Sequence, residues 1–123
     1  MWVEAALERG DRVVATARDV RALDDLVARY GAAVLPLPLD VTDRDAAIDS
    51  MARAHDFLGS LDVVVNNAGF LRRRPFADHT PDMVREIIGV HLLGSYFVSQ
   101  AAFAVMERQR YGRFVFTSSP GGT

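Results

Sequence analysis

Cysteine and lysine are both absent from this sequence of 123 residues. Without cysteine, the chain can form no disulfide and offers no thiolate as a nucleophile or a metal ligand. That absence suits a reducing compartment, so we expect a cytoplasmic protein. All 14 basic residues are arginines, so these residues cannot complete a mechanism that needs a lysine ammonium group.

The sequence also lacks a strong charge of one sign and a long apolar run. Its 14 basic and 16 acidic residues leave a formal net charge of −2, which argues against a nucleic-acid partner or an anionic membrane surface. No uninterrupted apolar run approaches the ~18 residues of a membrane-spanning helix. The length and the 50% hydrophobic content indicate one small globular domain at most.

Apolar runs with β-branched residues alternate along the chain with segments of helical periodicity. The apolar runs predict strands at 13–17, 34–39, 61–66 and 113–117. The periodic segments predict helices at 2–9, 19–30, about 42–57 and about 80–108. Strands that are apolar throughout and alternate with helices are typical of βαβ units, so we expect a parallel sheet with helices on both faces.

Prolines and capping residues refine this prediction. Pro36 and Pro38 lack amide donors, which places their strand at a sheet edge. Thr42 or Asp43 is expected to cap the helix that follows. Thr80, with a proline in the first turn after it, is expected to start the long fourth helix.

The carboxyl ends of the strands are the places to look for function, because ligands of parallel α/β sheets bind there. The residues that leave those ends are Arg18, Asp40, Asn66 to Gly69 and Thr117 to Ser119. The run Asn67-Ala68-Gly69 carries little side-chain bulk, so a ribose could approach its backbone. The alternative is that these three residues form an ordinary turn.

Three of these strand ends carry recognisable motifs. Asn66-Asn67-Ala68-Gly69 follows a Val-Val-Val strand, Leu39-Asp40-Val41-Thr42 follows the strand before it, and Gly112 to Ser119 includes the last strand. In order and spacing they resemble the short-chain dehydrogenase/reductase (SDR) family across nearly the whole chain. The resemblance implies a Rossmann-like, doubly wound parallel sheet in three α/β/α layers, with residues 1–123 forming part of an NAD(P)-binding domain. It also implies an oxidoreductase that interconverts an alcohol and a ketone by hydride transfer.

The resemblance also assigns contacts to the cofactor. Asp40 would meet the adenine amino group, and Val41 would lie beside the adenine ring. Asn67, Ala68 and Gly69 would line the cofactor cleft and tie neighbouring strands together. An alternative for Asp40 is that it only caps the next helix.

Arg18 bears on the choice of cofactor. NAD-preferring members of the family carry an acidic residue where this chain has Ala17, and a neighbouring arginine suits the 2′-phosphate of NADP. We therefore expect NADP. The alternative is that Arg18 pairs with Asp19 or with solvent, and an Asp19 side chain turned toward the ribose would favour NAD.

The resemblance assigns two residues to catalysis and none to a metal. Ser119 would be the catalytic serine, which hydrogen-bonds the substrate oxygen. His91 stands where the family usually has an asparagine, whose backbone carbonyl supports a water-mediated proton relay. A histidine keeps that carbonyl. The alternative for His91 is a neutral packing group.

The substrate is a small alcohol or ketone by resemblance. The run from Val90 to Phe97, with Tyr111-Gly112-Arg113, is most similar to the hydroxyacyl-CoA dehydrogenase domains of multifunctional β-oxidation proteins, which adds an acyl-CoA as a candidate. Arg72-Arg73-Arg74 would meet a phosphate of such a substrate or form a solvated loop edge. The helix at 80–108 is apolar on more than one face, so it is either buried in a monomer or part of a homo-oligomer contact.

The sequence departs from the family pattern at both ends. The family's Thr-Gly-x-x-x-Gly-x-Gly turn, the strand before it and the Tyr-x-x-x-Lys motif are not found in residues 1–123. That strand would lie between those at 13–17 and 61–66, so we expect two facing edges with unpaired backbone groups. Two hypotheses follow: a segment of an NADP-dependent oxidoreductase, or a catalytically inactive remnant or interaction module that binds no cofactor.

Overall fold

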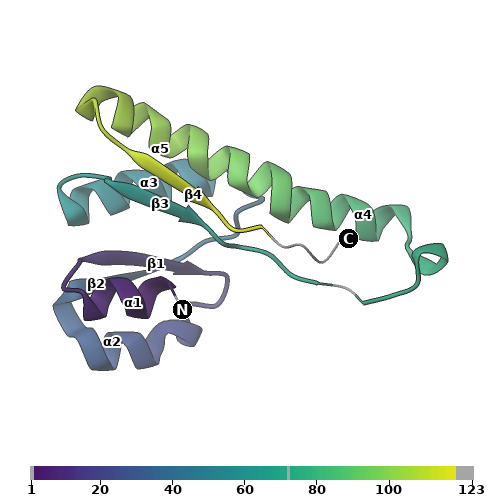
Figure 1. Cartoon of the computed structure of the whole chain (residues 1–123), viewed down its shortest axis with the longest axis horizontal. Helices are drawn as coiled ribbons and strands as arrows, with labels where there is room; N and C mark the ends of the chain where they lie inside the picture. The colour runs from purple at the N-terminus through teal and green to yellow at the C-terminus, as the bar shows by residue number, and fades with distance from the viewer. Residues whose placement is uncertain (1, 72, 119–123) are drawn as a thin grey trace.

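Strands and helices alternate along the chain as predicted (Figure 1). The computed structural model describes residues 2–71 and 73–118. The strands are β1 (Val13–Ala17), β2 (Val34–Pro38), β3 (Val63–Asn66) and β4 (Arg113–Phe116). The α-helices are α1 (Trp2–Glu8), α2 (Asp24–Tyr30), α3 (Arg44–Leu58), α4 (Pro81–Ile88) and α5 (Ser95–Gln109). The described elements also include the 3₁₀ helices η1 (Val20–Leu23), η2 (Gly31–Ala33) and η3 (Phe76–Asp78), and the π-helical segment η4 (Gly89–Gly94).

The four strands form two parallel pairs. β1 pairs with β2, and β3 pairs with β4. Within the described residues β1 and β3 are not hydrogen-bonded to each other, so each has one edge without a strand partner. This arrangement is the one expected when the central strand of a doubly wound sheet is not among the residues present.

The two prolines of β2 lie on its outer edge. The amide of Leu39 donates to the carbonyl of Ala17 across 2.9 Å. In a parallel ladder only alternate residues bond to a given neighbour, so Leu37 also faces β1, and Pro36 and Pro38 face away from it. Their missing amides therefore cost no ladder hydrogen bond, and the prediction of an edge strand is confirmed.

Helices cover the strands on both sides, and each side has its own apolar cluster. On one side α1 and α2 pack on β1 and β2 around Leu7, Ala15 and Leu26. On the other side α3 and α5 pack together over the strands, with a cluster that includes Ala47 and Ala102. The result is three α/β/α layers, visible in Figure 1.

The caps of α3 and α4 follow from short polar side chains. Asp43, one of the two candidates, caps α3 by accepting a hydrogen bond from the amide of Ala46 at 3.0 Å. Thr80 caps α4 by accepting one from the amide of Met83 at 3.2 Å. Acceptors at these positions satisfy amides that a helix start leaves unpaired.

Two predicted helices are not uniform. The helix expected at 19–30 starts as η1, because the carboxylate of Asp19 accepts a hydrogen bond from the amide of Arg21 and tightens the first turn. The long fourth helix is interrupted by η4. Because that helix is apolar on several faces, its sequence pattern does not show where the α-helical period changes to a π-helical one. At the end of η4, Gly94 packs closely on Val41: a Cβ built at Gly94 would lie 2.6 Å from Val41 Cγ2.

The stretch Pro81–Gln109 is long and apolar enough to span a membrane by length and composition alone. Core helices of soluble domains meet the same criterion. Here α5 packs on α3 and β3 through Val98, Ala102, Val105 and Met106, all buried. We therefore assign the stretch to the α/β/α fold.

Candidate functional site

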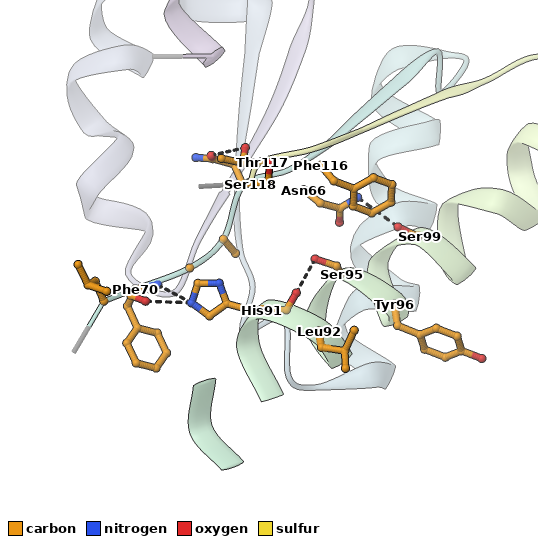
Figure 2. A pocket seen from close by; sticks show the side chains of 14 residues that line it. Asn66, Phe70, His91, Leu92, Ser95, Tyr96, Ser99, Phe116, Thr117 and Ser118 are labelled. Carbon is orange, nitrogen blue, oxygen red and sulfur yellow. Dashed lines mark hydrogen bonds between the residues drawn. The ribbon is translucent and has the colours of Figure 1, made fainter. Parts of the chain in front are cut away.

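An open groove of about 840 Å³ lies where β3 and β4 end (Figure 2). Residues leaving β3 form one wall, residues leaving β4 another, and η4 with the start of α5 forms the third. Its described lining consists of Asn66, Asn67, Ala68, Gly69, Phe70, Leu71, His91, Leu92, Ser95, Tyr96, Ser99, Phe116, Thr117 and Ser118. No carboxylate or guanidinium belongs to that described lining, so the groove suits an uncharged reacting group.

Two asparagine side chains fix the walls relative to one another. The hydroxyl of Thr117 donates to Asn67 Oδ1 at 2.8 Å, which ties the exit of β4 to the exit of β3. The amide nitrogen of Asn66 donates to Ser99 Oγ at 3.1 Å, which ties β3 to α5. Asn67 thus links neighbouring strand ends by geometry, whatever it binds.

His91 connects η4 to the turn after β3. Its Nε2 lies 2.9 Å from the carbonyl oxygen of Phe70 and 3.1 Å from the Phe70 amide nitrogen (Figure 2). The ring also lies close to Gly69, because a Cβ built at Gly69 would be 2.5 Å from His91 Cε1. A side chain at position 69 would therefore have to displace the imidazole. The alternative of a buried packing group does not hold, because His91 is exposed to the groove.

The backbone carbonyl of His91, which the proton-relay hypothesis uses, already has one partner. Ser95 Oγ donates to it at 3.1 Å. A carbonyl oxygen has two lone pairs, so one acceptor site is left for a water. Ser119, the other candidate for catalysis, lies outside the described residues, whereas its neighbour Ser118 lines the groove.

Asp40 and Val41 lie at the end of β2, outside the lining of the groove. The hydroxyl and the amide of Thr42 both donate to Asp40 Oδ1, at 2.6 Å and 2.9 Å. These bonds lower the pKa of Asp40, and the nearby charge of Arg18 adds a smaller effect in the same direction. Asp40 is exposed and does not cap α3, since Asp43 does. A carboxylate that stays ionised and exposed at a strand end can accept a hydrogen bond from an amino group.

Replacing Thr42 by valine should raise the pKa of Asp40 toward its ordinary value, because the hydroxyl donor is the main cause of the depression. A depressed pKa in the folded state stabilises the fold above the unfolded pKa, and this contribution is lost as pH falls through the folded pKa. As pH rises from acid to neutral, the free energy of unfolding of the variant should therefore increase less than that of the wild type. A ¹³C NMR titration of the Asp40 carboxyl tests this. Thr16→Val, at another exposed threonine, is the control, and an unchanged Asp40 pKa in Thr42→Val contradicts the assignment.

Arg18 is exposed at the end of β1, and the alternative pairing with Asp19 is not seen within the described residues. The carboxylate of Asp19 instead pairs with the guanidinium of Arg21 at 2.7 Å and also accepts from the Arg21 amide. Both hydrogen bonds lower the pKa of Asp19. The carboxylate that would have favoured a ribose hydroxyl is therefore occupied, whereas the guanidinium of Arg18 faces solvent.

The structure thus brings together some of the predicted site residues in one groove, whereas the others lie outside it. Asn67, Ala68, Gly69 and His91 line a common groove. Arg18, Asp40 and Val41 lie at the ends of the neighbouring pair of strands, and Val41 reaches back to the groove helix at Gly94. Within residues 2–71 and 73–118, no group of three or more His, Cys, Asp or Glu side chains could hold a metal ion.

Sequence reasoning missed the contribution of α5 to the groove. Ser95, Tyr96 and Ser99 line it, and Phe116 lines it from β4. Serines four residues apart in an otherwise apolar helix lie on one face. That spacing was a usable signal, because a polar stripe on a helix that packs against a sheet must face a cavity, solvent or a hydrogen-bonding partner.

Comparison with known proteins agrees with this geometry. The family model for short chain dehydrogenases matches residues 2–123. Oxidoreductase BOA17 of Botryotinia fuckeliana (strain B05.10) is 37% identical over 120 residues, which cover 97% of this chain and 44% of that protein. Peroxisomal multifunctional enzyme type 2 of Mus musculus is 48% identical over 69 residues, which cover 56% of this chain and 9% of that protein.

Solved structures show the same fold. A short-chain dehydrogenase from Streptomyces avermitilis matches with a TM-score of 0.90 and 37% identity, over 98% of this chain and 44% of that one. A structure described as ElxO with NADP bound matches with a TM-score of 0.88 and 26% identity, over 98% of this chain and 51% of that one. The chain therefore spans about half or less of the length of these relatives. With the fold, the groove and a family match over nearly all its residues, the chain belongs to the short-chain dehydrogenase family.

Proposed function

We propose that this chain forms the adenine end and part of the substrate groove of an NADP-dependent oxidoreductase, which interconverts an alcohol and a ketone by hydride transfer. The observation that carries the proposal is the placement of Arg18, Asp40 and the Asn67–Gly69 turn at the carboxyl ends of successive parallel strands. This is the edge at which α/β sheets bind dinucleotides.

The residues at that edge fit the parts of NADP that they would hold. Arg18 has a solvent-facing guanidinium whose fork of donors matches a phosphate. Asp40 uses Oδ1 for Thr42, so Oδ2 is available to the adenine amino group. When bound, the nicotinamide would exchange a hydride with the substrate carbon. The solved relative described with NADP bound supports the choice of cofactor.

The groove supports a small, uncharged substrate. Its described lining combines hydroxyls and amides with Phe70, Tyr96 and Phe116, which suits a carbonyl or hydroxyl group on an apolar body. Arg73 and Arg74 are exposed on the loop that leaves the groove. They extend the proposal to an acyl-CoA, whose phosphates they would meet. Arg72 lies outside the described residues.

A homo-oligomer is part of the same proposal. Along α4, η4 and α5, an apolar stripe is exposed that includes Ile88, Leu92 and Phe103. Val105, on the same helix, is instead buried in the core. The exposed stripe has the residues of a subunit contact.

Replacing Arg18 by aspartate should weaken NADPH binding by about 10- to 150-fold and leave NADH binding nearly unchanged. The reason is that only NADPH carries the phosphate, and hydrogen bonds to charged groups contribute about 1.5–3 kcal/mol. Titration calorimetry of both cofactors with the full gene product measures this. Arg53→Asp makes the same charge change at an exposed position of α3. Equal losses for the two cofactors would refute the preference for NADP.

A second candidate is a catalytically inactive SDR-like module. The observation in its favour is the departure at His91, which stands where the family usually has an asparagine. The two candidates differ in what surrounds these residues in the mature protein. The intact mass of the natural gene product, with ketone-dependent NADPH oxidation by that product, separates them.

A further inference from the structure

The imidazole of His91 faces both polar groups of one peptide residue. Nε2 is 3.1 Å from the amide nitrogen of Phe70 and 2.9 Å from its carbonyl oxygen. A single ring nitrogen either accepts or donates a hydrogen bond, and its proton decides which. His91 can therefore satisfy one of these two backbone groups at a time through Nε2.

We propose that His91 is a positioning residue whose protonation selects how the groove wall at Phe70 is held. Neutral His91 with its proton on Nδ1 accepts the hydrogen bond from the Phe70 amide. Protonated His91 loses that acceptor and donates from Nε2 to the Phe70 carbonyl. The inference rests on the proposed function, because it is the substrate groove that this wall shapes.

Histidine introduces this choice where the family's more usual asparagine does not. A carboxamide carries a donor nitrogen and an acceptor oxygen on separate atoms, so it can hold an amide and a carbonyl together. Histidine is also the side chain that changes charge between about pH 5 and 8. A histidine at this position therefore makes the hydrogen bond to Phe70 depend on the proton at Nε2.

The residues around His91 link the protonation of its ring to the turn after β3. The imidazole lies against Gly69, whose missing Cβ leaves room for the ring. Ser95 Oγ bonds to the carbonyl of the same histidine and fixes its place on the helix. A change of hydrogen bonding at Nε2 therefore acts on the backbone of Phe70, which lines the groove together with Leu71.

Few titratable groups other than His91 lie in the described lining of the groove. Tyr96 on α5 is the other titratable side chain in the described lining. The turn that contacts the ring, from Asn66 to Leu71, carries no charged side chain. The nearest charges in sequence are Arg85 and Glu86 on α4 and the arginines that follow Leu71.

NMR of the ¹⁵N-labelled chain tests the proposal without any cofactor. Between pH 8 and pH 5, the Phe70 amide proton should move upfield as the nitrogen acceptor is lost, and its protection from exchange, relative to the intrinsic rate at each pH, should fall. Its midpoint should equal that of the His91 Cε1 proton. His91→Asn and His91→Phe both remove the titrating ring, so the Phe70 amide should no longer show this midpoint in either variant.

The proposal fails if the wild-type Phe70 amide does not follow the His91 titration, or if it titrates equally in His91→Asn. The wild-type measurement stands alone should a variant fold poorly. Loss of NADPH discrimination in Arg18→Asp is a separate readout, so failure of the cofactor proposal and failure of the His91 proposal are distinguishable.

Discussion

Replacing Leu37 by alanine should lower the free energy of unfolding by about 2–5 kcal/mol, the usual cost of truncating a buried leucine. Leu37 is the largest of the fully buried side chains, with 1% of its surface exposed. By strand alternation its side chain projects to the same face of β2 as that of Leu39, which belongs to the apolar cluster beneath α3 and α5. A domain of ordinary stability has only about 5–15 kcal/mol in total, so this variant should lose a large part of it.

Thermal unfolding followed by circular dichroism measures the effect. At about 4 °C per kcal/mol for a domain of this size, the Tm should fall by roughly 8–20 °C. Leu71→Ala removes the same atoms from a side chain that is 73% exposed, and should change Tm little. Equal losses in the two variants would show that Leu37 does not fill the core between α3 and β2.

The second large effect is expected at Gln109, the last residue of α5. Its Nε2 donates to the carbonyls of Leu61 and Tyr111, at 2.9 Å and 3.1 Å, and its Oε1 accepts from the Leu61 amide at 2.9 Å. Leu61 is buried, so Gln109→Ala leaves backbone groups without partners at the entrance to β3. We expect a loss of about 1–3 kcal/mol in unfolding free energy, the cost of an unsatisfied buried group.

Two further variants separate this role from simple loss of a glutamine. Gln109→Glu places a carboxylate against two carbonyl oxygens and should be no better than alanine. Gln100→Ala removes an exposed glutamine whose amide bonds only weakly to Tyr96, at 3.3 Å, and should cost less than about 0.5 kcal/mol. Chemical unfolding curves that give Gln109→Ala and Gln100→Ala the same free energy of unfolding would contradict this role of Gln109.

Much of the fold could be predicted because its signals are local. Apolar β-branched runs marked all four strands, and the acceptors of Asp43 and Thr80 marked two helix starts. The prolines of β2 indicated an edge before any pairing was known. The π-helical segment η4 could not be predicted in this way. It ends at Gly94, which packs on Val41 from a distant part of the chain, a contact that local periodicity does not reveal.

The candidate site was predicted in part for the same reason. Strand ends are visible in sequence, so Asp40 and the Asn67–Gly69 turn could be named. The hydrogen-bond partners of these residues could not be predicted. Asp40 could either cap α3 or accept a hydrogen bond from Thr42, and only the folded structure shows that it does the second. The resemblance points to the backbone carbonyl of His91. In the structure its ring also makes a contact, with Phe70, which lies 21 positions earlier in the chain.

The outward-facing prolines of β2 set a limit on how such chains can associate. Pro36 and Pro38 present no amide along that flank, so a further strand cannot register against it at these positions. The proline flank of β2 therefore disfavours the addition of a further strand on that side.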